Sequence, residues 1–108
     1  MDNLTRILKA LADENRLTII GMLLTHDLCV GALSKHLDIS EAAVSQHLKV
    51  LREAGLVTGE KRGYYTHYGV NRELIRQTAG ELERLAEQQR EEMECGKGDG
   101  HTCCRGEQ

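Results

Sequence analysis

Apolar residues in the first half of the chain recur three or four positions apart, the spacing of a helix face. This pattern predicts four helices, over about residues 4–11, 17–24, 30–37 and 41–54. Asp13 and Ser40 are suitable N-caps for the second and the fourth helix, and Gly55 is a suitable stop for the fourth. The fourth helix is expected to bury the stripe formed by Val44, Leu48 and Leu51.

The pattern then changes to runs of β-forming residues. Residues 56–60 and 64–70 predict two strands, and Lys61-Arg62-Gly63 between them predicts the turn of a β-hairpin. After the hairpin, Asn71 can cap a long final helix over about residues 72–94. The apolar stripe of that helix consists of Leu74, Thr78, Leu82 and Leu85. A core this small cannot cover so long a stripe, so part of the helix is expected to pair with a second copy of the chain.

Composition favours one small helical domain and excludes several classes of protein. The chain has 108 residues and lacks Pro, Phe and Trp, so its core must be aliphatic. No stretch approaches the roughly 18 apolar residues of a membrane helix, and the start lacks a signal-peptide pattern. We therefore expect a soluble cytoplasmic protein with no membrane partner. The length excludes a multi-domain enzyme, and the sequence offers no catalytic triad, phosphate-binding glycine loop or acid pair, which predicts a protein that is not an enzyme.

The net charge of −3 is unevenly distributed along the chain. Residues 1–70 are neutral, with eight Lys or Arg and eight Asp or Glu, whereas residues 71–108 carry six and nine. Within residues 35–72, six basic residues outnumber four acidic ones. A modest basic surface can therefore form around the fourth helix and the hairpin, although the whole chain is acidic.

The predicted order, two helices separated by a turn and followed by a basic hairpin, is typical of a winged helix-turn-helix. In that fold the second helix enters the major groove of DNA. The expected fold is therefore mainly α with a small β-hairpin. The candidate DNA-binding residues come from the start and outward face of the fourth helix and from the hairpin turn: Ser40, Ala42, Ser45, Gln46, His47, Lys49, Lys61 and Arg62. An ordinary solvated helix face and a charged turn explain the spacing alone equally well.

Several stretches closely resemble the ArsR/SmtB family of metal-sensing repressors. The most specific is VSQHLKVL at residues 44–51, followed by AGLV at 54–57; LADENRL at 11–17 and KRGYYTHY at 61–68 also resemble that family. The resemblance covers residues 4–94. It implies a winged helix-turn-helix homodimer that binds an imperfect inverted repeat in double-stranded operator DNA and releases it when an inducer binds. It also implies a dimer interface formed by the first and last helices.

Two inducer sites found in this family are incomplete or missing in this sequence. The pair of thiols at the start of the third helix is reduced to Cys29, because Gly31 stands where the second thiol is expected. Cys29 remains a candidate ligand, although a small half-buried side chain explains it better. The Asp and His pairs that bind zinc or nickel on the last helix have no counterpart, since residues 72–94 contain neither Asp nor His.

The strongest chemical signal is a Cys-rich end. Cys95, Cys103 and Cys104 are candidate metal ligands, and three intervening glycines would let the chain fold back to bring them together. Three thiolates suit As(III) or Sb(III), a fourth ligand from His101 would suit zinc, and two thiolates would suit Cu(I). We therefore expect a DNA-binding and dimerisation domain over residues 1–94 and a flexible metal-binding tail over 95–108. The expected inducer is a thiophilic metal(loid) ion, As(III) above the others, and no organic cofactor is expected.

Three other interpretations remain open. The tail can be an incidental Cys-rich end, or a redox switch in which Cys95 or Cys103 closes a disulfide, with Cys95 the better partner for the vicinal pair. The protein can also be a small metal-buffering thiol protein without DNA binding. The polar face of the fourth helix and the basic hairpin argue against this last interpretation.

Overall fold

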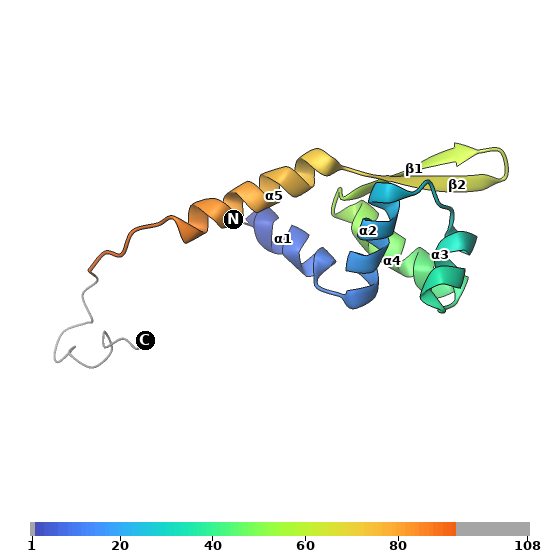
Figure 1. Ribbon diagram of the computed structural model, residues 1–108, viewed down its shortest axis with the longest axis horizontal. Helices are drawn as coiled ribbons and strands as arrows, with labels where there is room; N and C mark the ends of the chain where they lie inside the picture. The colour runs from blue at the N-terminus through green and yellow to red at the C-terminus, as the bar shows by residue number, and fades with distance from the viewer. Residues whose placement is uncertain (1, 93–108) are drawn as a thin grey trace.

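The structure, a computed structural model, describes residues 2–92. Its elements are α1 (Asp2–Leu11), α2 (Glu14–Thr25), α3 (Val30–Leu37), α4 (Glu41–Glu53), β1 (Val57–Arg62), β2 (Tyr65–Val70) and α5 (Arg72–Ala86). Helices α1 to α4 form the body of the molecule, the β1–β2 hairpin extends from one end, and α5 runs in the other direction alongside α1 (Figure 1). The predicted winged helix-turn-helix architecture, mainly helical with one antiparallel hairpin, is confirmed.

The predicted N-caps begin three of the helices. Asp13 Oδ2 accepts a hydrogen bond from the backbone N–H of Arg16 at 3.1 Å, and Ser40 Oγ accepts one from Ala43 at 3.0 Å. The side chain of Asn71 caps α5 in the same way. Each such cap satisfies a backbone donor that the helix leaves free and contributes on the order of 1 kcal/mol. The starts of α2, α4 and α5 are therefore determined locally by the sequence.

The core is aliphatic, as the composition predicts. The fully buried side chains come from α1 to α4 and from the start of the hairpin: Ile7, Ile19, Leu33, Val44, Leu48, Leu51, Leu56 and Val57. The three expected stripe residues of α4 are among them. Burial of side chains of this size contributes roughly 1.5–3 kcal/mol each, so α4 is held firmly against the body. Within residues 2–92, no helix has the length and the apolar character needed to cross a membrane.

The hairpin turn lies one position later than predicted. Lys61 pairs with Thr66 and Arg62 with Tyr65 in the antiparallel ladder, which leaves Gly63 and Tyr64 as the two turn residues. Gly63 has φ +64°, and Tyr64 does not have a positive φ. A positive φ at the first turn residue alone is the pattern of a type II′ turn, which matches the twist of paired strands. Lys61 and Arg62 are therefore strand residues, not the turn that the sequence suggested.

Helix α5 is shorter than predicted. It ends at Ala86, whereas the sequence pattern extended it to residue 94. The backbone N–H of Glu87 is shared among the carbonyls of Glu83, Arg84 and Leu85, which closes the last turn. Residues 87–92 contain no apolar side chain that could be buried. A helix without a packed apolar face is only marginally stable in water, which accounts for the earlier end.

Candidate nucleic-acid interface

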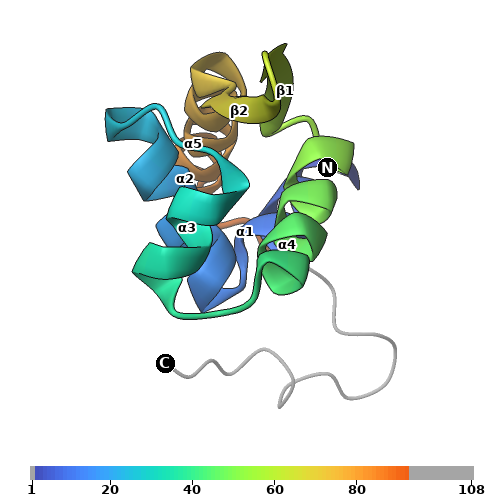
Figure 2. The same ribbon diagram turned by 90° about the vertical axis from the view of Figure 1, so that its right-hand side faces the viewer.

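The turn between α3 and α4 sets the direction of the predicted recognition helix. Asp38 adopts the left-handed conformation, with φ 57° and ψ 44°, which short polar side chains tolerate better than most. Ser34 Oγ donates a hydrogen bond to the carbonyl of Ile39 at 2.6 Å, and the Ile39 N–H donates back to the Ser34 carbonyl. These contacts fix the two helices against each other. Figure 2 shows α4 at one side of the bundle, opposite α2 and α3.

The outer surface of α4 is polar and open to solvent. Its exposed side chains include the predicted Ala42, Ser45, Gln46 and Lys49, together with Glu41 and Arg52. The predicted Ser40 is also exposed, but its hydroxyl oxygen is already engaged as the N-cap. Small and uncharged residues near the start of the helix allow close approach to a groove, and the basic residues lie one or two turns later. This surface can donate and accept hydrogen bonds at base edges and phosphates.

His47 lies in a different environment from the other predicted residues of α4. Its side chain is only 19 % exposed. Its Nδ1 lies 3.4 Å from Nη1 of Arg16 and 3.9 Å from Oδ2 of Asp13. Arg16 and Asp13 belong to the start of α2, so His47 faces the junction between α1 and α2 as well as the edge of α4.

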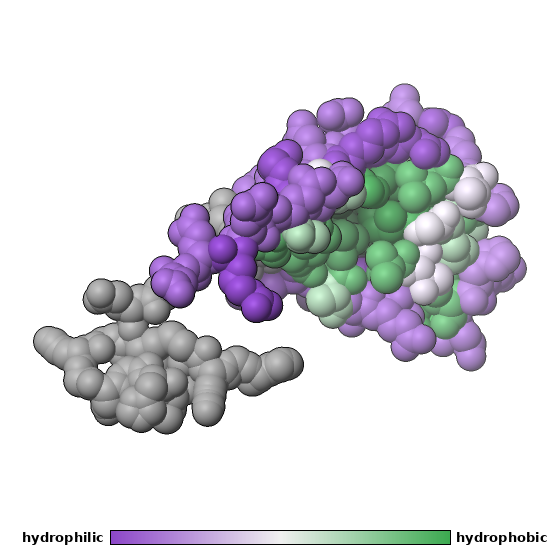
Figure 3. Space-filling view, turned by 60° about the vertical axis from the view of Figure 1, so that its left-hand side comes forward, coloured by the Kyte–Doolittle hydropathy of each residue, from purple (hydrophilic) through white to green (hydrophobic). Residues whose placement is uncertain are grey.

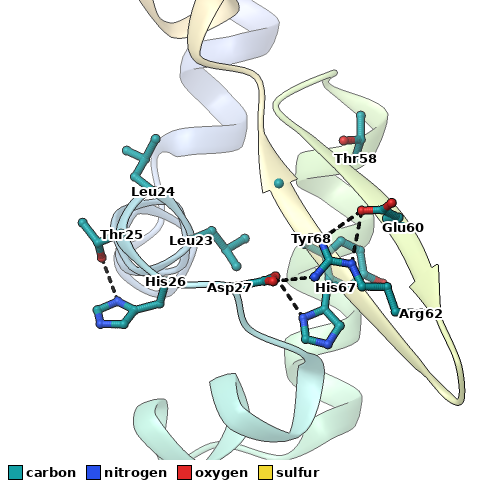
Figure 4. A pocket seen from close by; sticks show the side chains of 11 residues that line it. Leu23, Leu24, Thr25, His26, Asp27, Thr58, Glu60, Arg62, His67 and Tyr68 are labelled. Carbon is teal, nitrogen blue, oxygen red and sulfur yellow. Dashed lines mark hydrogen bonds and ion pairs between the residues drawn. The ribbon is translucent and has the colours of Figure 1, made fainter.

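The β1–β2 hairpin, which we call the wing, meets the loop between α2 and α3 at a group of polar, ionisable side chains that we call the wing cluster: Asp27, Glu60, Arg62 and His67 (Figure 4). Arg62 Nη1 donates to Oδ2 of Asp27 at 2.5 Å, while its Nε and Nη2 approach Oε1 of Glu60 at 3.3 and 3.0 Å. His67 Nδ1 lies 3.0 Å from Oδ1 of Asp27. The cluster therefore ties both strands of the hairpin to the loop between α2 and α3.

Contacts within the wing cluster stabilise the charged forms of Asp27 and Arg62. The Arg62 hydrogen bond, followed by the contact with His67, holds the pKa of Asp27 below its ordinary value. The carboxylates of Asp27 and then Glu60 raise the pKa of Arg62 in return. Lys61 is the neighbouring strand residue, and successive side chains of a strand point to opposite faces. Both predicted wing cations are exposed, but Arg62 is paired with the carboxylates of Asp27 and Glu60, whereas no ion pair involves Lys61 within residues 2–92.

Three residues of this region could not be identified from the sequence pattern. No local pattern singles out Arg16 or Asp27, because their partners His47 and Arg62 lie 31 and 35 positions away. Tyr64 was assigned to a strand but occupies the tip of the wing, where it is 98 % exposed. An exposed aromatic residue at a turn could have been found from the glycine before it, since Gly63 marks the true turn.

The predicted metal ligands Cys95, Cys103 and Cys104, with His101, lie outside the described residues. Within residues 2–92, no group of three or more His, Cys, Asp or Glu side chains is arranged to hold a metal ion. Cys29 is half-buried at the N-cap position of α3, makes no side-chain capping hydrogen bond, and forms a backbone bridge with His67. The part of the chain that the structure describes therefore offers Cys29 as a single thiol and not as part of a ligand set.

Comparisons with known proteins identify the family of this chain. Residues 13–58 match the family described as bacterial regulatory protein, arsR family. The chain is 42 % identical over 79 residues to the transcriptional activator HlyU of Vibrio cholerae, and the match covers 73 % of this chain and 73 % of that protein. The chain belongs to the arsR family. As an arsR-family protein it is a transcriptional regulator and not an enzyme.

Two further arsR-family similarities bear on the fold and on the relatives' functions. The arsenical resistance operon repressor of Staphylococcus xylosus is 38 % identical over 72 residues, which are 67 % of this chain and 69 % of that protein. The solution structure of a homodimeric winged helix-turn-helix DNA-binding domain from Mycobacterium bovis superposes with a TM-score of 0.66 at 26 % identity. That match covers 82 % of this chain and 83 % of the other.

Proposed function

We propose that this protein represses transcription as a homodimer that binds an imperfect inverted repeat and is released by a thiophilic inducer. In this proposal α4 enters the major groove and contacts it through Ala42, Ser45, Gln46, His47 and Lys49. Ser40 lies at the start of the same helix beside the phosphate backbone, and Lys61 of the wing reaches the adjacent backbone. The inducer is As(III), bound by Cys95, Cys103 and Cys104.

The observation that carries the proposal is the open polar face of α4. Helix α4 buries Val44, Leu48 and Leu51 completely and presents a polar, solvent-exposed surface on its other side, which is the arrangement expected of a helix that enters a DNA groove. The exposed Lys49 and Arg52 on that side supply the cations that a phosphate backbone requires, although the whole chain carries a net charge of −3.

The homodimer is supported by an apolar surface that a single chain leaves uncovered. Leu82 and Leu85 on α5 are 41 % and 46 % exposed, and Leu17 on α2 is 57 % exposed. Apolar side chains gather on one face of the molecule beside α5 (Figure 3). The Mycobacterium bovis domain of the same fold is homodimeric. A two-fold dimer would place two α4 helices on successive major grooves, roughly 34–36 Å apart along the DNA.

The inducer is inferred from the thiols that the DNA-binding body does not use. Soft ions prefer thiolate ligands, and three Cys residues lie within residues 93–108. The Staphylococcus xylosus relative is named an arsenical resistance operon repressor, which favours As(III) over Cu(I) or zinc. Ion binding just beyond α5 would change the angle between two protomers that pair through this helix. A coupling of about 1–3 kcal/mol corresponds to a change in DNA affinity of about 5–150-fold.

A thiol redox switch is the second candidate. It uses the same residues, because oxidation of Cys95 with Cys103 or Cys104 would also constrain the chain beyond α5. The vicinal pair alone is a poor switch, since a disulfide between neighbouring residues closes a strained ring. The relative HlyU is named an activator, so the direction of regulation also requires a direct test.

The test is an anaerobic fluorescence-anisotropy titration of DNA from upstream of the protein's own gene. Arsenite, zinc, Cu(I) and an oxidant are added to separate samples of the preformed complex. Release by stoichiometric arsenite, lost in Cys95→Ser and in the double variant Cys103→Ser/Cys104→Ser but kept in Cys29→Ser, would support the As(III) site. Release by the oxidant alone would support the redox switch. Failure of the protein to bind this DNA would contradict the whole proposal.

A further inference from the structure

We propose that Arg16 fixes the tautomer of His47, so that α4 presents the His47 Nε2–H as a hydrogen-bond donor to operator DNA. That the Nε2–H donates to operator DNA rests on the proposed function, whereas the tautomer of His47 is a property of the free protein. Arg16 is then a positioning residue, since it acts through His47 and does not itself contact the DNA in this scheme.

The Arg16 guanidinium is held in place by the end of α1. Its Nε donates to the carbonyl of Ala10 at 2.6 Å, and its Nη2 donates to the carbonyl of Lys9 at 3.4 Å. These carbonyls lie in the last turn of α1, where helix carbonyls lack their usual intrahelical partners, and that of Lys9 also accepts the backbone N–H of Ala12 at 3.3 Å. The backbone N–H of Arg16 is in turn held by Asp13, the N-cap of α2. The direction of the remaining Nη1 is thus determined by two helix ends.

Nη1 of Arg16 points at the His47 ring, and this contact is compatible with only one neutral tautomer of His47. The distance from Arg16 Nη1 to His47 Nδ1 is 3.4 Å. Because a guanidinium has only donors, Nδ1 can take part in this contact only through its lone pair. The ring proton of neutral His47 then resides on Nε2. The competing carboxylate oxygen, Oδ2 of Asp13, lies 3.9 Å from Nδ1, beyond hydrogen-bonding distance.

The Nε2 side of the ring is available to a partner. In residues 2–92, every buried side-chain nitrogen or oxygen has a hydrogen-bond partner. Nε2 of His47 has no partner within these residues, so it is not among the buried atoms. Nε2 therefore reaches the solvent, although the side chain as a whole is only 19 % exposed. A rigid N–H donor on a helix that also presents Ser45 and Gln46 fits an acceptor of operator DNA, either a phosphate oxygen or a purine N7.

The tautomer is tested first, on the free protein. A long-range ¹H–¹⁵N correlation spectrum distinguishes the two neutral forms of each imidazole, and the His47 signals are assigned by their loss in His47→Gln. We expect the Nε2–H form to dominate in the wild type and to lose that dominance in Arg16→Gln. The exposed His36 should be unaffected and serves as an internal reference. A wild-type spectrum with the proton on Nδ1 would overturn the inference without bearing on DNA binding.

The target of Nε2–H is tested by two isosteric substitutions. The amide nitrogen of Gln can occupy the place of Nε2, whereas that of Asn can occupy only the place of Nδ1. We expect His47→Gln to bind the upstream DNA within about threefold of the wild type and His47→Asn to bind it about tenfold more weakly, the loss of one hydrogen bond to a charged or strongly accepting group. Both variants are first compared with the wild type by thermal melting.

The remaining outcomes distinguish this inference from the proposed function. Equal binding by His47→Gln and His47→Asn, with wild-type binding intact, overturns the inference alone. No binding by the wild type overturns the proposed function and the DNA target together, while the tautomer result stands. If the Asn variant loses affinity equally for unrelated DNA, the acceptor is a phosphate; a loss confined to the operator identifies a base.

Discussion

Asp27 accepts a hydrogen bond from Arg62, which lies 35 positions later at the end of β1. The same carboxylate contacts His67 on β2, so a single loop residue holds both strands of the wing. The wing is therefore attached to the body of the protein at a point between α2 and α3. This contact also means that the positive charge of Arg62 is paired with a carboxylate, whereas the neighbouring Lys61 is exposed and forms no ion pair within residues 2–92.

Replacing Asp27 by Asn should strengthen DNA binding at low salt. The change removes the negative charge that competes with phosphate for Arg62, and one additional phosphate contact makes the slope of log affinity against log salt steeper by about one. Anisotropy titrations at several salt concentrations measure this slope.

The matched control is Glu60→Gln, which removes the second carboxylate beside Arg62 but leaves the link between the loop and the wing. In the wild type, Arg62→Ala should weaken binding less than Lys61→Ala. In the Asp27→Asn background, Arg62→Ala should cancel the gain. An unchanged salt slope in Asp27→Asn would show that Arg62 does not become available to DNA.

Acid should detach the wing before it unfolds the body. The hydrogen bond from Arg62 holds the pKa of Asp27 below its ordinary value of 3.8, so the folded state binds the proton less readily than the unfolded state. The stabilisation is therefore fully present above pH 3.8 and is lost as the pH falls through the lower, folded-state pKa. NMR signals of β1 and β2 should shift in this acid range together with the Asp27 carboxyl carbon.

Asp13 provides an internal comparison for this titration. Its pKa is also lowered, but mainly because its carboxylate accepts the backbone N–H of Arg16 at the start of α2. Its protonation should therefore perturb α2 and leave the wing unchanged. The wing shifts should disappear in Asp27→Asn, and their persistence there would assign them to another group.

The features that could be predicted from the sequence are those set by neighbours in the chain. Asp13, Ser40 and Asn71 act as caps because a side chain reaches a backbone N–H three residues later. The buried stripe of α4 follows from helical periodicity alone. The wing turn was placed one residue early, because Gly63 is compatible with the last or the first position of a turn and only strand pairing distinguishes the two.

The contacts that give the site its electrostatics could not be predicted in this way. Arg16 meets His47, and Asp27 meets Arg62, across more than thirty positions of the sequence. Such contacts depend on how α2, α4 and the wing pack together, which no local pattern encodes. From the sequence alone, Arg62 and Lys61 are equivalent cations of the hairpin, and His47 is one of several candidates on the outward face of the fourth helix.

Truncation of Leu51 should strongly destabilise the protein. Leu51 is fully buried on the inner face of α4, and removal of most of its side chain leaves a cavity beneath the helix. We expect Leu51→Ala to lower the free energy of unfolding by roughly 2–5 kcal/mol. The neighbouring Val50 is 38 % exposed, so Val50→Ala should change it by less than about 0.5 kcal/mol. Urea denaturation at matched protein concentration measures both, and similar values for the two variants would contradict the burial pattern.

Introducing charge on the apolar face of α5 should prevent dimerisation. Leu82 and Leu85 lie on one side of the helix and are 41 % and 46 % exposed in a single chain, so the double variant Leu82→Glu/Leu85→Glu would place two carboxylates in the proposed interface. Charges buried without partners are strongly unfavourable, and we expect a monomer in sedimentation velocity at micromolar concentration. DNA affinity should fall sharply as well, because a monomer contacts only one half-site.

The control is Glu83→Gln, an exposed change on the same helix, which should remain dimeric. A double variant that stays dimeric would place the interface on another surface, and the proposed route from an ion beyond α5 to the two α4 helices would then be wrong.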